Sequence, residues 1–130
     1  MERIKIELPS LDGFFSTGAV EESLIAEAEV GLGVVFADDY RECLSLYGAV
    51  SGNGHELTGI CNAARLNVVE VTNEEKELRN DIPAEWYVIE QLHIDGVVIW
   101  QANDQSIYRT VPGREPEKIY DDLFSYISAQ

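Results

Sequence analysis

Apolar residues in the first third of the chain follow two different periods. Between residues 20 and 32 they recur at helical spacing, at Val20, Leu24, Ile25 and Ala28. This pattern predicts an amphipathic helix over 20–32, which Gly31 and Gly33 are expected to end. The preceding stretch "RIKIEL" instead alternates Ile4, Ile6 and Leu8, which predicts a short strand that Pro9 ends.

The stretch "ADDYRECLSLYG", residues 37–48, predicts a second helix. Its apolar residues lie at i, i+3, i+4 and i+7, in one stripe: Tyr40, Cys43, Leu44 and Tyr47. Phe36 is placed to pack on Tyr40 just before the helix begins, and Gly48 is expected to end it.

Two adjacent carboxylates, Asp38 and Asp39, begin this second helix. Paired carboxylates can hold a metal, but neighbours in a helix point about 100° apart, which suits a shared metal poorly. A negative charge in the first turn gains roughly 0.3–1 kcal/mol from the exposed N–H groups. We interpret both as helix-start residues and keep a partner contact, together with Glu42, as the alternative.

The middle of the chain predicts a strand and a third helix. "HELTGI" is typical of a strand after the turn "SGNG", with Gly59 as a candidate bulge. Asn67 followed by Glu70 resembles a capping box, and we expect Val68, Val71 and Leu78 to face inward from the helix that follows. Its acidic stretch "NEEKEL" is expected to face solvent.

The last third predicts a meander and a closing helix. "WYVIEQL" and "VVIWQ" are β-rich and lie on either side of Asp95 and Gly96, the strongest hairpin signal in the chain. "SIYRTV" would be the third strand. In "PEKIYDDLFSYI" the apolar residues lie at i, i+4 and i+8, with Pro116 near the first helical position. They are Ile119, Leu123 and Ile127.

These elements predict one α+β domain over residues 1–130, in the order α-α-β-α-β-β-β-α. We expect an antiparallel sheet of about four strands flanked by about four helices. No apolar run approaches the ~18 residues of a membrane span, and the N-terminus is too charged for a signal peptide, so we expect a cytoplasmic protein.

Charge is the unusual feature of the composition. The chain has 9 Lys and Arg against 24 Asp and Glu, a net charge of −15. Such a field repels nucleic acid and anionic membranes and attracts a basic partner. Acidity that serves solubility alone is the competing interpretation. The oligomeric state is left open by the sequence.

Signals for catalysis are weak. His55 and His93 are isolated histidines, and Cys43 and Cys61 form no metal-ligand pattern. "GAVSGNG" lacks the Lys and Ser/Thr of a phosphate loop, and no G-x-S-x-G or H-E-x-x-H occurs. A pair of carboxylates working as in glycosidases stays open, because their separation is spatial. We expect no catalytic, cofactor or metal site.

Two tryptophans, Trp86 and Trp100, lie on predicted strands. Packing of the sheet against helices is one interpretation. The alternative is an aromatic anchor for a partner, in which Tyr108 would also take part.

The order of these motifs resembles that of the SUKH superfamily, which contains the Smi/Knr-type and YobK-like proteins. The resemblance is carried by Leu32 and Gly33, by Asp38, Asp39 and Tyr40, and by Leu44 and Tyr47. "ELTGI", "NVVEVTNEEKELR", "IPAEWYVIEQLHIDGVVIW" and "IYDDLFSYI" continue it over about residues 14–128. The chain departs from the family pattern at Ala37, where a proline is usual, and at Cys43 and Ala49.

The resemblance implies a binding module. Bacterial members are similar to immunity proteins that neutralise toxins, many of them nucleases, and eukaryotic relatives resemble regulatory interaction proteins. Because a nuclease has a basic surface where it binds phosphate, an acidic protein can occupy that surface. The candidate partner-binding residues are Glu74, Glu75, Glu77, Asp38, Asp39, Glu42, Asp95, Trp86, Trp100 and Tyr108.

Overall fold

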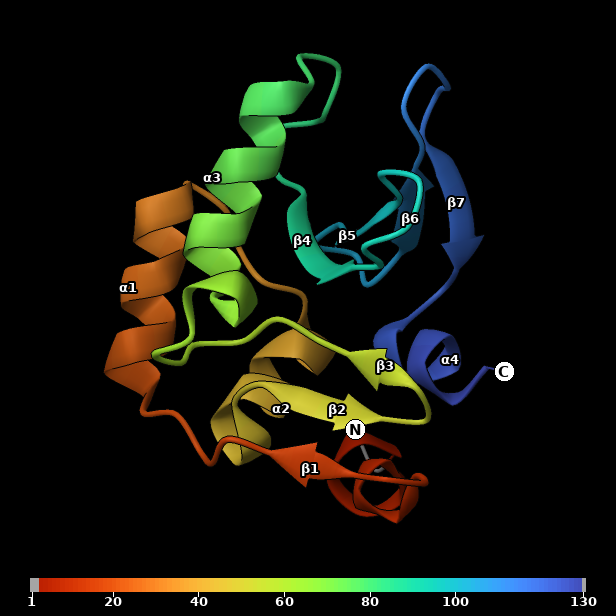
Figure 1. The fold of residues 1–130 in the computed structure, drawn as a ribbon. Coiled ribbons are helices and arrows are strands. Elements are labelled where there is room, and N and C mark those ends of the chain that lie inside the picture. The colour runs from red at the N-terminus through yellow and green to blue at the C-terminus, as the bar shows by residue number, and fades with distance from the viewer. Residues whose placement is uncertain (1–2, 130) are drawn as a thin grey trace.

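The computed structural model describes residues 3–129 and confirms the predicted α+β class (Figure 1). The first half of the chain forms a π-helical turn η1 (Arg3–Glu7), a 3-10 turn η2 (Leu8–Ser10), β1 (Phe15–Ser16), α1 (Glu22–Leu32), α2 (Asp38–Tyr47), β2 (Val50–Gly52) and β3 (His55–Glu56). The second half forms a 3-10 turn η3 (Ala64–Leu66), α3 (Val68–Leu78), β4 (Tyr87–Gln91), β5 (Val98–Gln101), β6 (Ile107–Thr110), β7 (Glu117–Tyr120) and α4 (Leu123–Ser128).

The strands form two antiparallel sheets. One has the order β1-β2-β3, and the other is a meander with the order β4-β5-β6-β7. Side chains of the meander alternate between two apolar clusters, as the period of a strand requires. Ile99 joins the main core with α1, α2 and α4, whereas Val98 and Trp100 pack on the other side with Val71 of α3. Figure 1 shows α1 and α3 side by side at one edge of the molecule.

The predicted helices α1 and α2 are present, but α1 begins at Glu22, so Val20 precedes it, and Gly31 lies within it. Gly33 ends α1 in the left-handed conformation, and the ring centroids of Phe36 and Tyr40 are 5.2 Å apart. Ile25 and Ala28 are buried, but Leu24 is 46% exposed, so the apolar face of α1 is narrower than its sequence predicted.

The N-terminal prediction was wrong: Arg3–Glu7 is helical, not a strand. Ile4 and Leu8 are buried, while Ile6 is 62% exposed. A spacing of four residues brings Ile4 and Leu8 to one side of a helical turn, and an alternating pattern of only three residues does not distinguish this from a strand.

The strand predicted in "HELTGI" is only two residues long, and it pairs with an unpredicted strand, β2. The turn between them lies at Asn53 and Gly54, both at positive φ (53° and 82°). Asn-Gly is a strong two-residue hairpin signal, so the sequence contained the evidence for this hairpin.

Helix α3 begins as predicted, since the Asn67 side chain accepts hydrogen bonds from the N–H groups of Val69 and Glu70. Val68 and Val71 are buried. The prediction for Leu78 was wrong: it is 77% exposed at the end of the helix.

The C-terminal helix prediction was wrong in its first half. Glu117–Tyr120 is strand β7, which pairs with β6, and α4 spans only Leu123–Ser128. Asp122 has an extended backbone and its side chain accepts a hydrogen bond from Ser125 N at 2.8 Å, so the helix begins there. The helical spacing of Ile119 was therefore coincidental.

The hairpin between β4 and β5 is confirmed. Asp95 and Gly96 have φ values of 52° and 69°, and Val97 N donates to Ile94 O at 3.0 Å. This tight turn brings Gly96 against Pro112 of the β6–β7 loop.

Candidate binding surface

An acidic stripe runs along the outer face of α3. Glu70, Glu74 and Glu77 are all exposed, and their spacing of i, i+4 and i+7 places them on one face of the helix. Like charges at these spacings destabilise a helix by about 0.2–0.5 kcal/mol per pair. Glu70 lies in the first turn of α3, where the helix N-terminus favours a negative charge, so this electrostatic cost falls mainly on Glu74 and Glu77.

The basic residues nearest the stripe are engaged elsewhere. Residues 67–85 contain six acids and two bases. Lys76 Nζ donates to Ala84 O at 2.8 Å, and burial lowers the pKa of this amine. Arg79 forms two hydrogen bonds to the Asp81 carboxylate, at 2.9 and 2.7 Å. Neither cation compensates the stripe.

Glu75 differs from its neighbours on α3. It is half-buried and accepts a hydrogen bond from Gln91 Nε2 of β4 at 2.5 Å. It therefore faces the four-stranded sheet and the cleft beside it.

A cleft of about 1030 Å³ lies next to this face of α3. Its walls come from the end of α3 and the segment after it, from the β4–β5 hairpin and from the β6–β7 loop. Its lining includes the carboxylates of Glu75, Glu77 and Glu115 and the apolar side chains of Leu78, Val97 and Pro112.

Arg79 joins two walls of the cleft. Besides its pair with Asp81, its guanidinium donates to Val111 O at 3.3 Å and to Arg114 O at 2.8 Å. Its side chain is only 20% exposed. Because these bonds tie the exit of α3 to the β6–β7 loop, they hold the width of the cleft.

The predicted residues of α2 lie away from this cleft. Asp38 is exposed in the first turn of α2 and Glu42 is half-buried. Asp39 was also a candidate partner residue, and the structure corrects this: it is 4% exposed. Its carboxylate accepts from Gln101 Nε2 and from Leu123 N, both at 2.9 Å. Burial raises the pKa of Asp39, and these hydrogen bonds partly oppose the shift.

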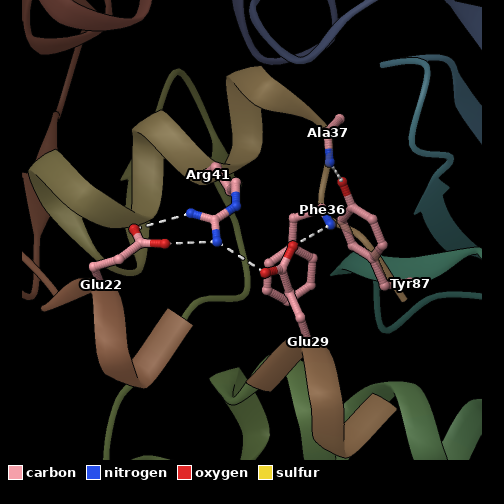
Figure 2. A network of polar contacts seen from close by, with 6 residues as sticks. All are labelled: Glu22, Glu29, Phe36, Ala37, Arg41 and Tyr87. Carbon is pink, nitrogen blue, oxygen red and sulfur yellow. Dashed lines mark hydrogen bonds and ion pairs between the residues drawn. The ribbon is translucent and has the colours of Figure 1, made fainter. Parts of the chain in front are cut away.

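A second polar network fixes the entry to α2 (Figure 2). Arg41 pairs with Glu22 at 2.7 Å and with Glu29 at 2.8 Å, and Glu29 Oε2 accepts from Phe36 N at 2.8 Å. In the same view Ala37 N donates to the Tyr87 hydroxyl at 2.9 Å. These contacts join α1, α2 and β4, so this network is structural.

Both tryptophans belong to the core, which corrects their candidacy as exposed anchors. Trp100 is fully buried and its indole Nε1 donates to Thr110 Oγ1 at 2.8 Å. Trp86 is 6% exposed and stacks on Tyr108, with ring centroids 4.1 Å apart. Tyr108 alone of the three is half-exposed.

The two histidines have different surroundings. His93 and Asp95 are both exposed in the hairpin turn between β4 and β5. His55 is paired with the buried Glu90, with Nδ1 2.9 Å from Oε1. Within residues 3–129 no three His, Cys, Asp or Glu side chains are grouped as a metal site would need, and no helix there is long and apolar enough to cross a membrane.

The structure thus gathers part of the predicted set. Glu75 and Glu77 line the cleft, Glu74 lies on the adjoining stripe, and Asp95 precedes the lining residue Gly96. Sequence reasoning missed Glu70 and Glu115. The spacing of Glu70 from Glu74 was a visible signal, whereas Glu115 reaches the cleft only through the pairing of β6 with β7.

The fold and the family agree. The family model described as "SMI1-KNR4 cell-wall", one of the SUKH models, matches residues 13–129. The match covers nearly the whole chain, so the protein belongs to this family. Comparison with individually curated proteins gives no match.

Proposed function

We propose that this chain is a single-domain, non-catalytic immunity protein that binds and neutralises a basic, nuclease-type bacterial toxin domain in the cytoplasm. Membership of the SUKH family supports a protein-binding role. The observation that carries the proposal is the uncompensated stripe of Glu70, Glu74 and Glu77 on α3. A rigid helix that presents carboxylates to solvent can occupy the cationic surface with which a nuclease binds phosphate.

The contact is electrostatic and steric. An interface of this kind buries about 1,600 Å² in total. Exposed charges each contribute little to affinity but together accelerate association, and salt weakens this effect because the Debye length is about 8 Å at 0.15 M.

The experiment takes a nuclease-type toxin domain from a gene adjacent to that of this chain as the partner and measures association kinetics. Reversing Glu70, Glu74 and Glu77 to Lys should slow association strongly, and the wild-type rate should fall as salt rises. The matched control reverses Glu7, Asp12 and Glu21, which are exposed and make no side-chain hydrogen bond within the described residues. This control changes the net charge by the same amount, and it should associate with the toxin domain faster than the α3 triple reversal does.

Tight binding that is indifferent to salt and to both triple reversals would exclude electrostatic capture through α3. A second candidate is a regulatory interaction protein with a non-toxin partner, which the words "cell-wall" in the family description favour. Neutralisation of the neighbouring toxin in a growth assay separates the two, because a regulatory protein would give no protection.

A further inference from the structure

The cleft beside α3 has an apolar wall as well as acidic residues. Leu78, Val97 and Pro112 line it, and Leu78 is 77% exposed. Ile94, in the hairpin turn two residues before Gly96, is 60% exposed. Apolar side chains left in solvent around a concavity mark a binding site more reliably than scattered ones.

Charge selects what this cleft can accept. Its lining contains four acids and two arginines, of which Arg79 and Asp81 pair with each other. Three carboxylates and Arg114 remain. Glu77 and Glu115 are exposed, and Glu75 adds a third carboxylate. An acidic occupant would be repelled. A purely apolar one would leave these carboxylates partly desolvated without partners.

We propose that the cleft receives a short extended segment of the partner protein in which aliphatic side chains alternate with lysine or arginine. The aliphatic side chains pack on Leu78, Val97 and Pro112, and the cations meet Glu75, Glu77 and Glu115. The inference rests on the proposed function, because it names the part of the basic partner that binds here. A volume of about 1030 Å³ admits a peptide segment of this kind.

A second copy of this chain is a poorer occupant. Its net charge of −15 repels another copy. Its one segment of alternating basic and apolar residues, Arg3–Ile6, is held in place because Ile4 is 2% exposed in the core.

The test titrates the full chain with an acetylated, amidated Lys-Leu-Lys-Leu-Lys peptide and follows amide shifts by ¹⁵N NMR at 0.15 M salt. The glycine amides of Gly96 and Gly113 flank the cleft and should shift and saturate. Glu-Leu-Glu-Leu-Glu should produce no shift at these two amides, and Lys-Ser-Lys-Ser-Lys should bind about tenfold more weakly, because it lacks the aliphatic side chains.

Leu78→Ser should weaken binding of the lysine–leucine peptide about tenfold. The matched control is Val30→Ser on α1, where the apolar side chain is 83% exposed and lies outside the cleft. It should leave the affinity unchanged. Shifts spread over all acidic surfaces, equal binding of the acidic peptide, or equal effects of the two substitutions would overturn the inference. Sedimentation of the free chain as a dimer that Leu78→Ser dissociates would also overturn it, in favour of a second copy.

This experiment contains no toxin, so its result is independent of the proposed function. If the neighbouring toxin domain is neutralised and Leu78→Ser binds it as tightly as wild type, the immunity role stands and the cleft is not its contact. If the peptide binds as described but the toxin is not neutralised, the cleft stands and the partner is a different basic protein.

Discussion

The carboxylate of Asp39 lies 2.9 Å from the backbone N–H of Leu123, a residue 84 positions later in the sequence. The same carboxylate accepts from Gln101 Nε2, so one side chain at the start of α2 joins β5 to the first residue of α4. Asp38, its neighbour, is exposed and makes no such contact within the described residues. Two adjacent aspartates that look equivalent in the sequence therefore have different roles.

Asp39→Ala should lower the free energy of unfolding by at least about 2 kcal/mol. The buried N–H of Leu123 loses its acceptor, and Gln101 Nε2 keeps only Gln105 O. Asp38→Ala should cost about 1 kcal/mol or less, the value of a charge in the first helical turn. Urea denaturation of both variants measures the difference. Equal costs would show that the buried contacts of Asp39 contribute nothing. A stoichiometric metal lost from Asp39→Ala would instead indicate a ligand role.

Glu29 stabilises the junction of α1 and α2 through two contacts. Its carboxylate accepts from the N–H of the buried Phe36 and from the guanidinium of Arg41. Glu29→Ala should destabilise the protein by about 1–3 kcal/mol, since a buried N–H loses its partner. Glu27→Ala, an exposed position on the same helix, is the control and should stay within about 0.5 kcal/mol. Thermal or urea unfolding that ranks the two equally would contradict the role of Glu29.

Local chemistry explains most of what the sequence predicted correctly. Asn67 caps α3, Gly33 ends α1, and Asp95 with Gly96 turns the hairpin, because each residue has a conformational preference that acts within a few positions. The predictions that were wrong concern segments whose structure depends on residues far away in the sequence. Residues 117–120 form a strand because β6 lies beside them, which overrides the helical spacing that Ile119 has in the sequence.

The same distinction applies to the candidate surface. Glu74 and Glu77 were predicted from the local acidic run. The cleft was not, because its walls are joined by contacts such as that between Arg79 and Arg114 O, 35 residues apart. The two tryptophans illustrate the limit most clearly: the sequence left core and anchor as alternatives, and only the packing of α3 on the sheet places them in the core.

His55 predicts a pH dependence. Its hydrogen bond to the buried Glu90 raises the pKa of His55 above the ordinary value of 6.5. Its stabilising contribution is therefore fully present below that unfolded-state value and is lost as the pH rises through the folded-state pKa. The Tyr126 hydroxyl also contacts Glu90, and burial raises the pKa of Tyr126, so it remains neutral in this range.

We expect the free energy of unfolding of the wild type to fall as the pH rises above the unfolded-state value of 6.5 and through the raised folded-state pKa of His55. His55→Gln should remove most of this slope. His93→Gln, which changes an exposed histidine in the hairpin turn, should retain it. Urea denaturation at several pH values measures the slopes, and a slope that survives in His55→Gln would assign the titration to another group.

Gly96 connects the fold with the cleft and gives the last prediction. Its φ of 69° is strained for any residue with a side chain, and an added Cβ would lie 2.8 Å from Pro112 Cγ. Gly113, which follows Pro112 in the β6–β7 loop, also has a positive φ (80°), but a Cβ there would meet nothing within 4 Å. Gly113→Ala should therefore lower the free energy of unfolding only by the backbone strain, about 1 kcal/mol. Gly96→Ala should lower it further, because its Cβ also displaces Pro112, and the larger side chain of Gly96→Val should have the greatest effect. Denaturation midpoints should rank the three variants in that order. An unchanged midpoint for Gly96→Val would show that the turn is not formed as described. All three residues line the cleft, but only the Cβ of Gly96→Ala displaces Pro112, so this variant should also weaken binding of the lysine–leucine peptide more than Gly113→Ala does.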